Sequence, residues 1–296
     1  VDGGKVELFV GGVQGDEKEV VEKMRTGQLH MAAITAVGLA KIVPETLIFQ
    51  LPGLFSSPKK LDTVRTKLGP EFEKKMEDAG FVLLGWGDVG LYYLMTNHPV
   101  VNPSDLSKVK MWVWSDDPIA QSLVKAAGAK GVPMGVPSVT AALANGKVDG
   151  YYTSPLAAAS LRWYNRTTHI MAHPISMGIG AVVVTKSAFD ALTPEEQTVL
   201  KDVAGLWSSR LTKKVRKDNR KTLQLMAGAR YEGVSLDASG KLSVGAAKAG
   251  SSKPTVTTWT PEDSRAWHKV FSKVWTDLAG RVYPHDLLAR VRKLAK

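Results

Sequence analysis

One stretch of the sequence decides the fold: "KVKMWVWSDDPIAQSLVKAAGAKGVPMGVPSVTAALANGKVDGYYT", residues 108–153. It reads in order as a strand ("KVKMWVW"), a helix (Pro118–Gly128), a short strand ("KGVPM"), a helix (Ser138–Gly146) and a strand ("VDGYYT"). Helices that alternate with short apolar strands are typical of parallel α/β sheets. We therefore expect an α/β fold around this segment.

The first strand of this stretch carries an unusual pair of tryptophans. At the strand period, Val109, Met111 and Val113 share one face, which predicts that they belong to the core. Trp112 and Trp114 fall on the other face, together with lysines. The pattern alone shows only that these two large rings face away from Val109, Met111 and Val113.

The alternation extends toward the N-terminus. We expect strands and helices, in order, at Lys5–Val10 (strand), Gly15–Leu29 (helix), His30–Thr35 (strand), Pro58–Gly80 (helix), Phe81–Gly87 (strand) and Gly90–Asn97 (strand).

The C-terminal third has a different character. Thr193 followed by Pro194 and acidic residues is a helix start, and little interrupts the pattern before Gly228, so we expect a long helix there. The Gly-, Ala- and Ser-rich segment Asp237–Pro254 predicts a hairpin or a mobile loop. Thr260–Gly280 predicts another capped amphipathic helix, and the chain ends in a basic helix.

Composition narrows the possible functions. A chain of 296 residues is long enough for two domains, and no apolar run approaches the length of a membrane-spanning helix. The absence of cysteine excludes disulfides, thiolate nucleophiles and iron–sulfur clusters.

The net charge of +11 requires that nucleic-acid binding be considered. The basic residues of Lys213–Lys221 lie on the expected long helix, without any recognised nucleic-acid motif. We interpret this cluster as a solvated face, with docking to a membrane-side partner as the alternative, and expect no nucleic acid.

No set of residues assembles into a catalytic or metal site. His169 and His173 stand four apart, but their β-branched and apolar surroundings suggest a strand, and no Glu follows the first His as in zinc proteases. "GIGAVVV" (Gly178–Val184) lacks the third glycine of a dinucleotide site. We therefore expect neither an enzyme, nor a metal, nor a cofactor.

Aromatic residues gather at or near the ends of the expected strands. In open α/β sheets the carboxyl ends of the strands line the ligand crevice, so this clustering favours a ligand cleft. The residues are Trp86, Tyr92, Tyr93, Trp112, Trp114, Tyr151 and Tyr152.

Several blocks, in this order, resemble the solute-binding proteins of tripartite ATP-independent periplasmic (TRAP) transporters, DctP type. They are "GDEKEVVEKMRTGQLHMAAITAVGLAKIVPE", "FQLPGLF", "LSKVKMWV", "AAGAKGVPM", "SVTAALANGKVDG" and "SAFDALTPEEQTVL". The resemblance covers most of Lys5–Gly233. It implies a two-lobe α/β periplasmic-binding-protein fold with crossing strands and a long lobe-spanning helix.

The resemblance also predicts where the lobes divide. Lobe I would comprise residues 1–96 and 181–215, and lobe II residues 97–180 and 216–296. Family chains begin with another strand and helix, so we expect that residues preceding Val1 are missing.

The resemblance places the family's binding residues on different side chains in this sequence. The two carboxylate-binding arginines fall on Trp112 and Tyr92, an asparagine falls on Thr153, and an aromatic contact position falls on Val136. A sealed carboxylate needs a cationic or multiply hydrogen-bonded partner, so we expect a neutral, largely hydrophobic or aromatic ligand. The predicted ligand-binding residues are Trp112, Tyr92, Thr153, Tyr151, Val136, Thr35, Trp114 and Trp86.

The resulting prediction is a periplasmic protein that closes on its ligand and delivers it to the membrane permease subunits of a TRAP transporter. A sugar-like ligand stacked on Trp112 and Trp114 would require more Asp, Asn and Arg near the strand ends than the sequence contains. The alternative is a carrier of lipid or hydrophobic ligand, or a partner-docking module, that is not coupled to a TRAP permease.

Overall fold

The structure is a computed structural model that describes residues 6–251 and 253–295. Its strands are β1 (Met31–Thr35), β2 (Phe81–Thr96), β3 (Met111–Trp114), β4 (Gly131–Met134), β5 (Gly150–Thr153), β6 (His169–Met171), β7 (Ser176–Thr185), β8 (Ser235–Leu236), β9 (Leu242–Ser243) and β10 (Thr255–Thr257). Its α-helices are α1 (Glu17–Arg25), α2 (Ala36–Leu39), α3 (Pro58–Asp78), α4 (Pro118–Ala126), α5 (Val136–Ala144), α6 (Pro155–Ser160), α7 (Lys186–Asp190), α8 (Pro194–Gly228), α9 (Pro261–Leu278) and α10 (His285–Leu294). Its 3-10 helices are η1 (Pro44–Gln50), η2 (Pro103–Lys108) and η3 (Trp163–Arg166).

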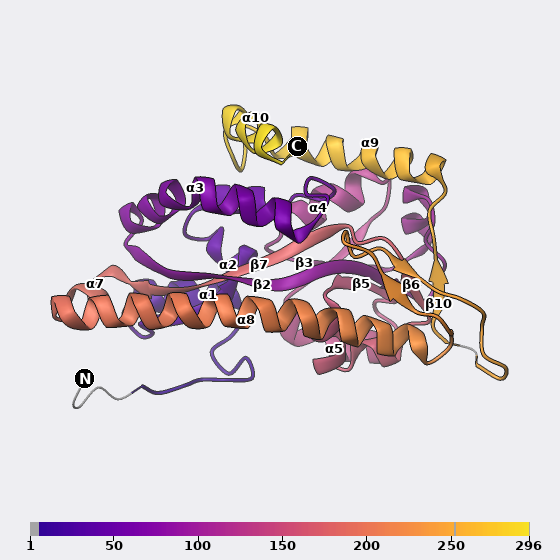
Figure 1. The fold of residues 1–296 in the computed structure, drawn as a ribbon, viewed down its shortest axis with the longest axis horizontal. Coiled ribbons are helices and arrows are strands. Elements are labelled where there is room, and N and C mark those ends of the chain that lie inside the picture. The colour runs from indigo at the N-terminus through magenta and orange to yellow at the C-terminus, as the bar shows by residue number, and fades with distance from the viewer. Residues whose placement is uncertain (1–5, 252, 296) are drawn as a thin grey trace.

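A single eight-stranded sheet forms the centre of the molecule, with the order β1-β7-β2-β5-β3-β4; β6 also pairs with β2, and β10 pairs with β6. The sheet is mixed: β3 pairs in parallel with β4 and β5, whereas the long β2–β7 pair is antiparallel. Parallel pairing, which the sequence predicts for the whole sheet, is present around β3 and between β6 and β10, whereas the other described pairs of this sheet are antiparallel. Helices cover both faces of the sheet, with α3 and α4 on one side and α8 on the other (Figure 1).

Strand β2 links two parts of the sheet. Its residues from Phe81 to Tyr92 pair with β7, and its residues from Tyr93 to Thr96 pair with β5. Two strands were expected here, but a bulge between Asp88 and Gly90 lets one continuous strand follow β7 throughout.

Helix α8 runs along β2 for 35 residues and begins with the capping box of Thr193 and Glu196. The helix and the strand approach closely, because a Cβ atom on Gly85 would overlap the Ser208 side chain. The long helix and its start are therefore present as the sequence predicts.

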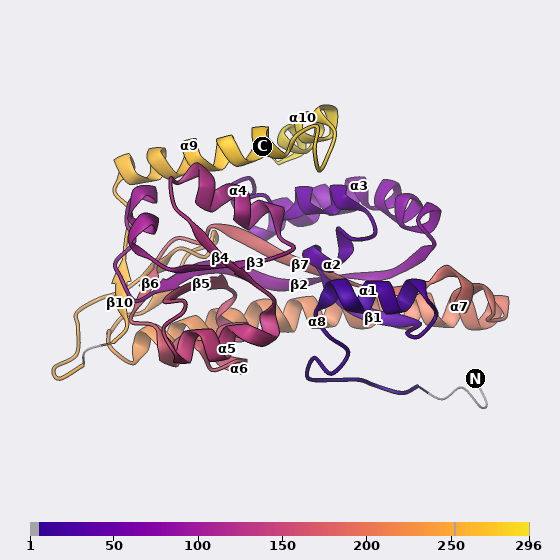
Figure 2. The ribbon, with the colours of Figure 1, turned by 180° about the vertical axis from the view of Figure 1, so that it is seen from behind.

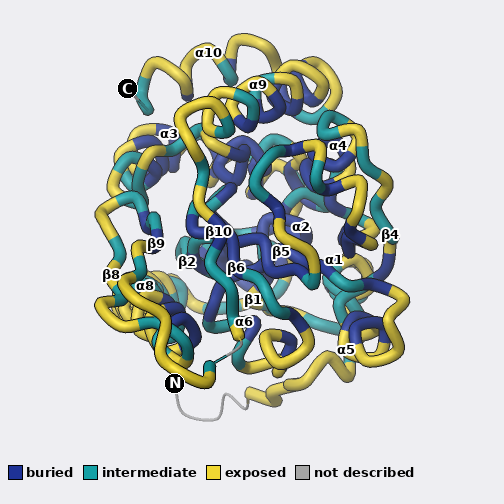
Figure 3. The backbone as a smooth tube through the Cα atoms, turned by 90° about the vertical axis from the view of Figure 1, so that its right-hand side faces the viewer, coloured by how far each residue is buried: buried dark blue, intermediate teal, exposed yellow. Residues whose placement is uncertain are grey.

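Seen from behind, α4 and α5 lie on opposite sides of β3 and β4 (Figure 2). Helices α9 and α10 form an outer layer over α4 and α3 (Figure 1). The view along the sheet shows buried residues concentrated on the strands, with exposed residues on the outer helices (Figure 3).

Two further expectations concern the N-terminal residues and the Gly-, Ala- and Ser-rich segment. Residues 6–10, which were expected to form a strand with Lys5, are exposed and outside any strand, and Lys5 lies outside the described residues. In the Gly-, Ala- and Ser-rich segment Asp237–Pro254, whose Ser252 is also outside the described residues, β9 pairs with β8, which directly precedes the segment, as an antiparallel hairpin. None of the described helices is long and apolar enough to span a membrane.

Candidate functional site

Four of the aromatic residues that were expected near strand ends, Tyr92, Trp112, Trp114 and Tyr152, form one cluster at β2, β3 and β5. Trp112 stacks on Tyr152 with a centroid distance of 5.1 Å and on Trp114 at 6.3 Å. Tyr92 also contacts Tyr152, in a tilted arrangement with a centroid distance of 6.0 Å. All four side chains are buried, between 3% and 8% exposed, so the rings fill the space between these strands with one another.

Polar atoms at the edges of the rings hold this cluster in place. The indole N–H of Trp112 donates to the carbonyl of Met134 at 3.0 Å, and that of Trp114 donates to Asp16 Oδ2 at 2.9 Å. The same Asp16 oxygen accepts from the backbone N–H of Val136 at 3.2 Å. Asp16, which precedes α1, therefore connects the β1–α1 part of the molecule to β3 and α5.

Asp117 lies at the centre of the polar contacts, fully buried at the start of α4. Its Oδ1 accepts from the N–H groups of Ile119 and Ala120, and Tyr152 donates its hydroxyl to Oδ2 at 2.9 Å. Burial raises the pKa of Asp117 above its ordinary value, and these hydrogen bonds oppose part of that rise. Burial, with the nearby Asp117 charge, also raises the pKa of the Tyr92 phenol.

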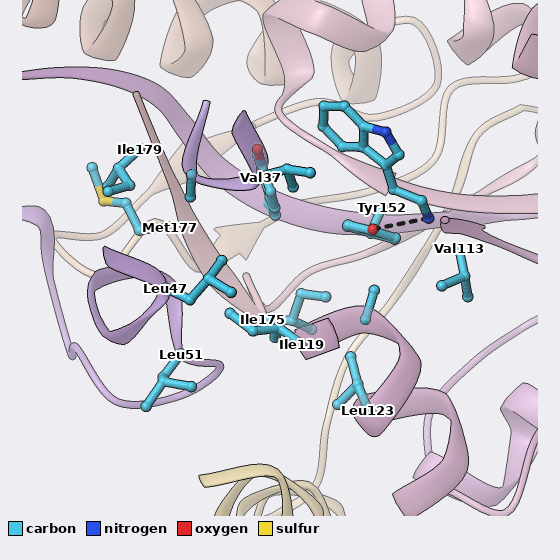
Figure 4. Close-up of a cluster of buried hydrophobic side chains, with 14 of the residues drawn as sticks. Val37, Leu47, Leu51, Val113, Ile119, Leu123, Tyr152, Ile175, Met177 and Ile179 are labelled. Atoms are coloured by element: carbon cyan, nitrogen blue, oxygen red, sulfur yellow. Dashed lines mark hydrogen bonds between the residues drawn. The ribbon is translucent and has the colours of Figure 1, made fainter. Parts of the chain in front are cut away.

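A small enclosed cavity lies beside Tyr92, Asp117 and Tyr152, and we call it the inner cavity. Its open space is about 20 Å³, room for about one water molecule. Among the described residues that line it, none is Lys, Arg or His. The side chains around Tyr152 in Figure 4 include Ile119 and Ile175, which both line this cavity. The complete lining is Gln50, Pro52, Tyr92, Leu94, Leu106, Met111, Asp117, Ile119, Ala120, Leu123, Val124, Tyr152, Ile175 and Ser176.

Of the predicted ligand-binding residues, only Tyr92 lines the inner cavity. Trp112 and Trp114 belong to the aromatic cluster that backs Tyr152, and the backbone of Trp114 donates to the Tyr152 hydroxyl at 3.4 Å (Figure 4). Val136 begins α5 and contacts Asp16, as described above. Their role in ligand binding stays a prediction.

The Thr35 hydroxyl makes two hydrogen bonds within the fold. Its hydroxyl donates to Glu17 Oε2 at 2.8 Å and accepts from the N–H of Val37, which caps α2. Thr153 is buried at the end of β5, opposite Tyr93 in the strand register.

Tyr151 and Trp86 lie elsewhere. Tyr151 packs against Trp163 at 5.4 Å, and its hydroxyl contacts the sulfur of Met95. Trp86 contacts Phe49 and lines a separate groove between α3 and α8. Neither residue lines the inner cavity.

Gln50 is a site residue that the sequence patterns did not indicate. It ends η1, is 3% exposed and lines the inner cavity, and its side-chain Oε1 is buried without a hydrogen-bond partner. A buried acceptor without a partner is costly, so Gln50 offers a hydrogen-bonding position to a ligand. Asp117 was also missed, although its position just before Pro118 is a typical N-cap signal.

The histidine pair was expected on one strand, but only His169 lies on a strand, and His173 follows β6 outside it. His169 begins β6, and the His173 ring stacks on Trp259 at a centroid distance of 4.3 Å. Among the described residues, no group of three or more His, Cys, Asp or Glu side chains could hold a metal ion.

The fold is that of the two-lobe periplasmic solute-binding proteins. A TRAP periplasmic solute-binding protein from Ralstonia eutropha with bound (S)-2-acetolactate superposes with a TM-score of 0.80 over 96% of this chain and 84% of that one, at 22% identity. One from Shewanella oneidensis with bound succinate gives a TM-score of 0.82 over 95% and 85%, at 18% identity.

Residues 3–241 match the family described as bacterial extracellular solute-binding protein, family 7, or DctP, and the chain belongs to that family. A curated solute-binding protein of Chromohalobacter salexigens is 25% identical over 211 residues, 68% of this chain and 61% of the relative. The C4-dicarboxylate-binding periplasmic protein DctP of Rhodobacter capsulatus is 25% identical over 230 residues, 76% of this chain and 68% of the relative.

The family comprises solute-binding receptors rather than enzymes, and its members are periplasmic. The chain spans about three fifths of the length of the first curated relatives that it matches, 61% and 60%.

Proposed function

We propose that this protein closes on a neutral, largely hydrophobic or aromatic small molecule in the periplasm and delivers it to the membrane permease subunits of a TRAP transporter. The observation that carries the proposal is the lining of the inner cavity. It presents apolar side chains and a buried carboxylate, Asp117, and no cationic side chain.

An anionic ligand fits this lining poorly. A carboxylate sealed away from water without a cationic partner costs several kcal/mol. In the inner cavity it would also lie near Asp117, so repulsion between like charges would add to that cost. A neutral ligand avoids both costs, and the amide of Gln50 and the Tyr92 hydroxyl provide it with hydrogen-bonding partners.

The aromatic cluster supplies enough surface for an apolar ligand. An aromatic side chain buries about 150–250 Å², and half of one ring at about 25 cal/mol/Å² contributes about 2–3 kcal/mol. Contacts with three rings would support micromolar binding after the cost of association. The inner cavity has room for about one water molecule, so ligand entry requires that the side chains of its lining move apart. A ligand that contacts both sides favours the closed state.

The neutral ligand proposed for this protein differs in charge from the ligands named for two similar proteins. The Rhodobacter relative is described as binding C4-dicarboxylates, and the Shewanella structure holds succinate. In the resemblance set out above, the family's two carboxylate-binding arginines fall on Trp112 and Tyr92. We infer that aromatic surface has replaced charge at these two positions.

The proposal also includes docking of the basic face of α8 to a membrane-side partner. Arg216 is bound to Asp62 and Asp88, and Arg220 donates to the carbonyls of Leu236 and Asp237. The basic face that remains exposed and could contact a membrane-side partner is formed by Lys213, Lys217 and Lys221.

Native mass spectrometry of gently purified protein tests the ligand class. We expect a neutral apolar molecule to co-purify, whereas a co-purified dicarboxylate contradicts the proposal. Trp112→Phe and Tyr92→Ala should each reduce retention of that molecule. Trp207→Phe and Tyr164→Ala, at aromatic residues that are 58% and 41% exposed, are the matched controls and should leave it unchanged.

The alternative function, a hydrophobic-ligand carrier or docking module without a TRAP permease, predicts a different result. In that case, ligand release would not depend on permease subunits in reconstituted membranes. Transport of the co-purified molecule that requires both this protein and the permease favours the first function.

A further inference from the structure

Three polar contacts join two parts of the molecule, and we call them the polar clamp. Lys41 Nζ lies 2.6 Å from Asp116 Oδ1, and Asp16 Oδ2 accepts hydrogen bonds from Trp114 Nε1 at 2.9 Å and from the Val136 N–H at 3.2 Å. Asp16 precedes α1 and Lys41 follows α2, so both belong to the part formed by α1, β1 and α2, which we call the α1–α2 side. Their partners belong to β3, α5 and the turn before α4, which together with β4 form what we call the α4–α5 side.

The two sides are separated in the strand order of the sheet. Strand β1 stands at one end of the order and β3 and β4 stand at the other, with β7, β2 and β5 between them. Figure 2 shows α1 and α2 to the right of β3 and β4, with α4 above these strands and α5 below them. Among the described helices and strands, none on the α1–α2 side packs along one on the α4–α5 side. The polar clamp therefore joins two parts that the sheet does not pair with each other.

The clamp lies beside the candidate site. Trp114 ends β3 and Val136 follows β4, so both stand at the carboxyl ends of two parallel strands. In open α/β sheets the ligand crevice lies outside these ends. Asp116 directly precedes Asp117, which lines the inner cavity. The three contacts therefore span the end of the sheet where a ligand is expected to bind.

Charge and close approach both strengthen the clamp. The N–H groups that donate to the Asp16 carboxylate form charge-assisted hydrogen bonds, which are stronger than neutral ones. The side chains of Lys41 and Asp116 are 28% and 27% exposed, so water and salt screen this ion pair less than a fully exposed one. A Cβ atom on Gly135 would lie 2.6 Å from Asp16 Oδ2, so the carboxylate fits here because residue 135 has no side chain.

We infer that the polar clamp is a closing device, which holds the α1–α2 side and the α4–α5 side together before a ligand binds. The two sides separate when a ligand enters or leaves, and the three contacts then break. Because the clamp and the ligand favour the same closed state, the clamp increases the population that the ligand stabilises. The inference rests on the proposed function only in that the protein closes on a ligand.

The distance between the two sides in ligand-free protein tests the clamp. The chain contains no cysteine, so spin labels attach only at two introduced residues, Glu22→Cys on α1 and Ala141→Cys on α5, both at exposed positions. Bound ligand is removed by unfolding and refolding, and native mass spectrometry verifies the unliganded mass. Double electron–electron resonance of this labelled parent protein should then show mainly one short distance, that of the closed state.

Two substitutions break the clamp by different routes. Lys41→Met keeps the aliphatic stem but removes the ammonium group, and Gly135→Ala displaces Asp16 without changing either charge. The ratio of open to closed molecules should rise about threefold in Lys41→Met and about tenfold in Gly135→Ala. The combined variant should show a clear population at a longer distance, and each single variant keeps the test valid if the other fails to fold.

Matched controls and salt distinguish the clamp from a general loss of stability. Lys75→Met breaks the Lys75–Glu45 pair, which is 33% and 22% exposed and joins α3 to η1, and Gly205→Ala adds a methyl group in open space on α8. Neither control should change the distances. Raising the salt concentration from about 0.05 M to about 1 M should open the parent protein more than Lys41→Met, because screening acts on the ion pair that this variant lacks.

The outcomes separate the clamp from the class of ligand. Distances that are unchanged in Lys41→Met, Gly135→Ala and their combination overturn the clamp, as does a ligand-free parent protein that is already open at low salt. Either result leaves the proposed neutral ligand in place. A co-purified dicarboxylate contradicts the proposed ligand, whereas the distances measured without ligand still decide the clamp.

Discussion

Glu17 provides a pH-dependent test of the packing beside the site. Its carboxylate accepts hydrogen bonds from the N–H and hydroxyl of Thr35 at 2.9 and 2.8 Å and from the N–H of Gly38 at 2.7 Å. Burial raises its pKa from 4.5 to about 6; these hydrogen bonds oppose the rise, and the neighbouring Asp16 charge adds to it. Glu17 thus connects the start of α1 to the loop that begins α2.

The direction of the pH effect follows from the proton that the folded state retains. Between about pH 4.5 and 6 the folded protein holds a proton on Glu17 that the unfolded chain has released. The contribution of this group to the free energy of unfolding is therefore complete below pH 4.5 and is lost as the pH rises to about 6. The interval between the two pKa values corresponds to about 2 kcal/mol.

Urea unfolding of the wild type and of Glu17→Gln at pH 4, 5, 6 and 7 measures this contribution. Between pH 4 and pH 7, the wild type should lose about 2 kcal/mol relative to the variant. The comparison removes the contribution of His173, whose lowered pKa acts in the opposite direction and is common to both proteins. Glu22→Gln, at an exposed position on α1, is the control. A difference between wild type and Glu17→Gln that does not change with pH would refute the reasoning.

Three further substitutions test contacts around the site. Trp114→Phe keeps the aromatic ring but leaves Asp16 without its indole partner, and we expect a loss of about 1.5–3 kcal/mol in urea unfolding; an unchanged midpoint would contradict this. Gly178→Ala places a methyl group against the Tyr92 ring. The free energy of unfolding should fall by about 1–3 kcal/mol, and the amount of co-purified ligand that is retained should change. Wild-type behaviour in both assays would show that the ring moves freely. Asn219→Leu removes a buried side chain that bonds to three backbone groups of α8, β2 and α6, and thermal unfolding should report a loss of about 1–3 kcal/mol; an unaltered melting temperature would exclude it.

Local patterns predicted most of the fold because local interactions form most of its elements. The start of α8 needs only Thr193, Pro194 and Glu196, which act within one turn of the chain. The strand at Lys5–Val10 was predicted by the same kind of pattern and is absent over residues 6–10. A strand requires a partner, and no other described segment pairs with those residues, so apolar alternation alone does not form one.

The candidate site was only partly predictable for the same reason. The alternation of Met111 and Trp112 on β3 placed the tryptophan on the face opposite Met111, and the positions of Trp112, Tyr92 and Tyr152 near strand ends suggested a common cleft. No local pattern shows that Tyr152 lies between them, since that depends on how β2, β3 and β5 pair. Gln50 was missed because it becomes a site residue only through contact with segments near residues 92, 120 and 175.

The net charge of the chain and the charge at its candidate site have opposite signs. The chain carries +11, yet the inner cavity contains one carboxylate, that of Asp117, and no cationic side chain. Arg216 illustrates why, because its guanidinium binds Asp62 and Asp88 between α8, α3 and β2 instead of facing a ligand. Charges on the surface act through water and salt, whereas groups that line a sealed cavity act at short range with little screening. The lining, and the side chains at Trp112 and Tyr92 in particular, should therefore determine which class of ligand binds, and exchanging exposed lysines of α8 for glutamine should alter the rate of association with charged partners but not the class of ligand.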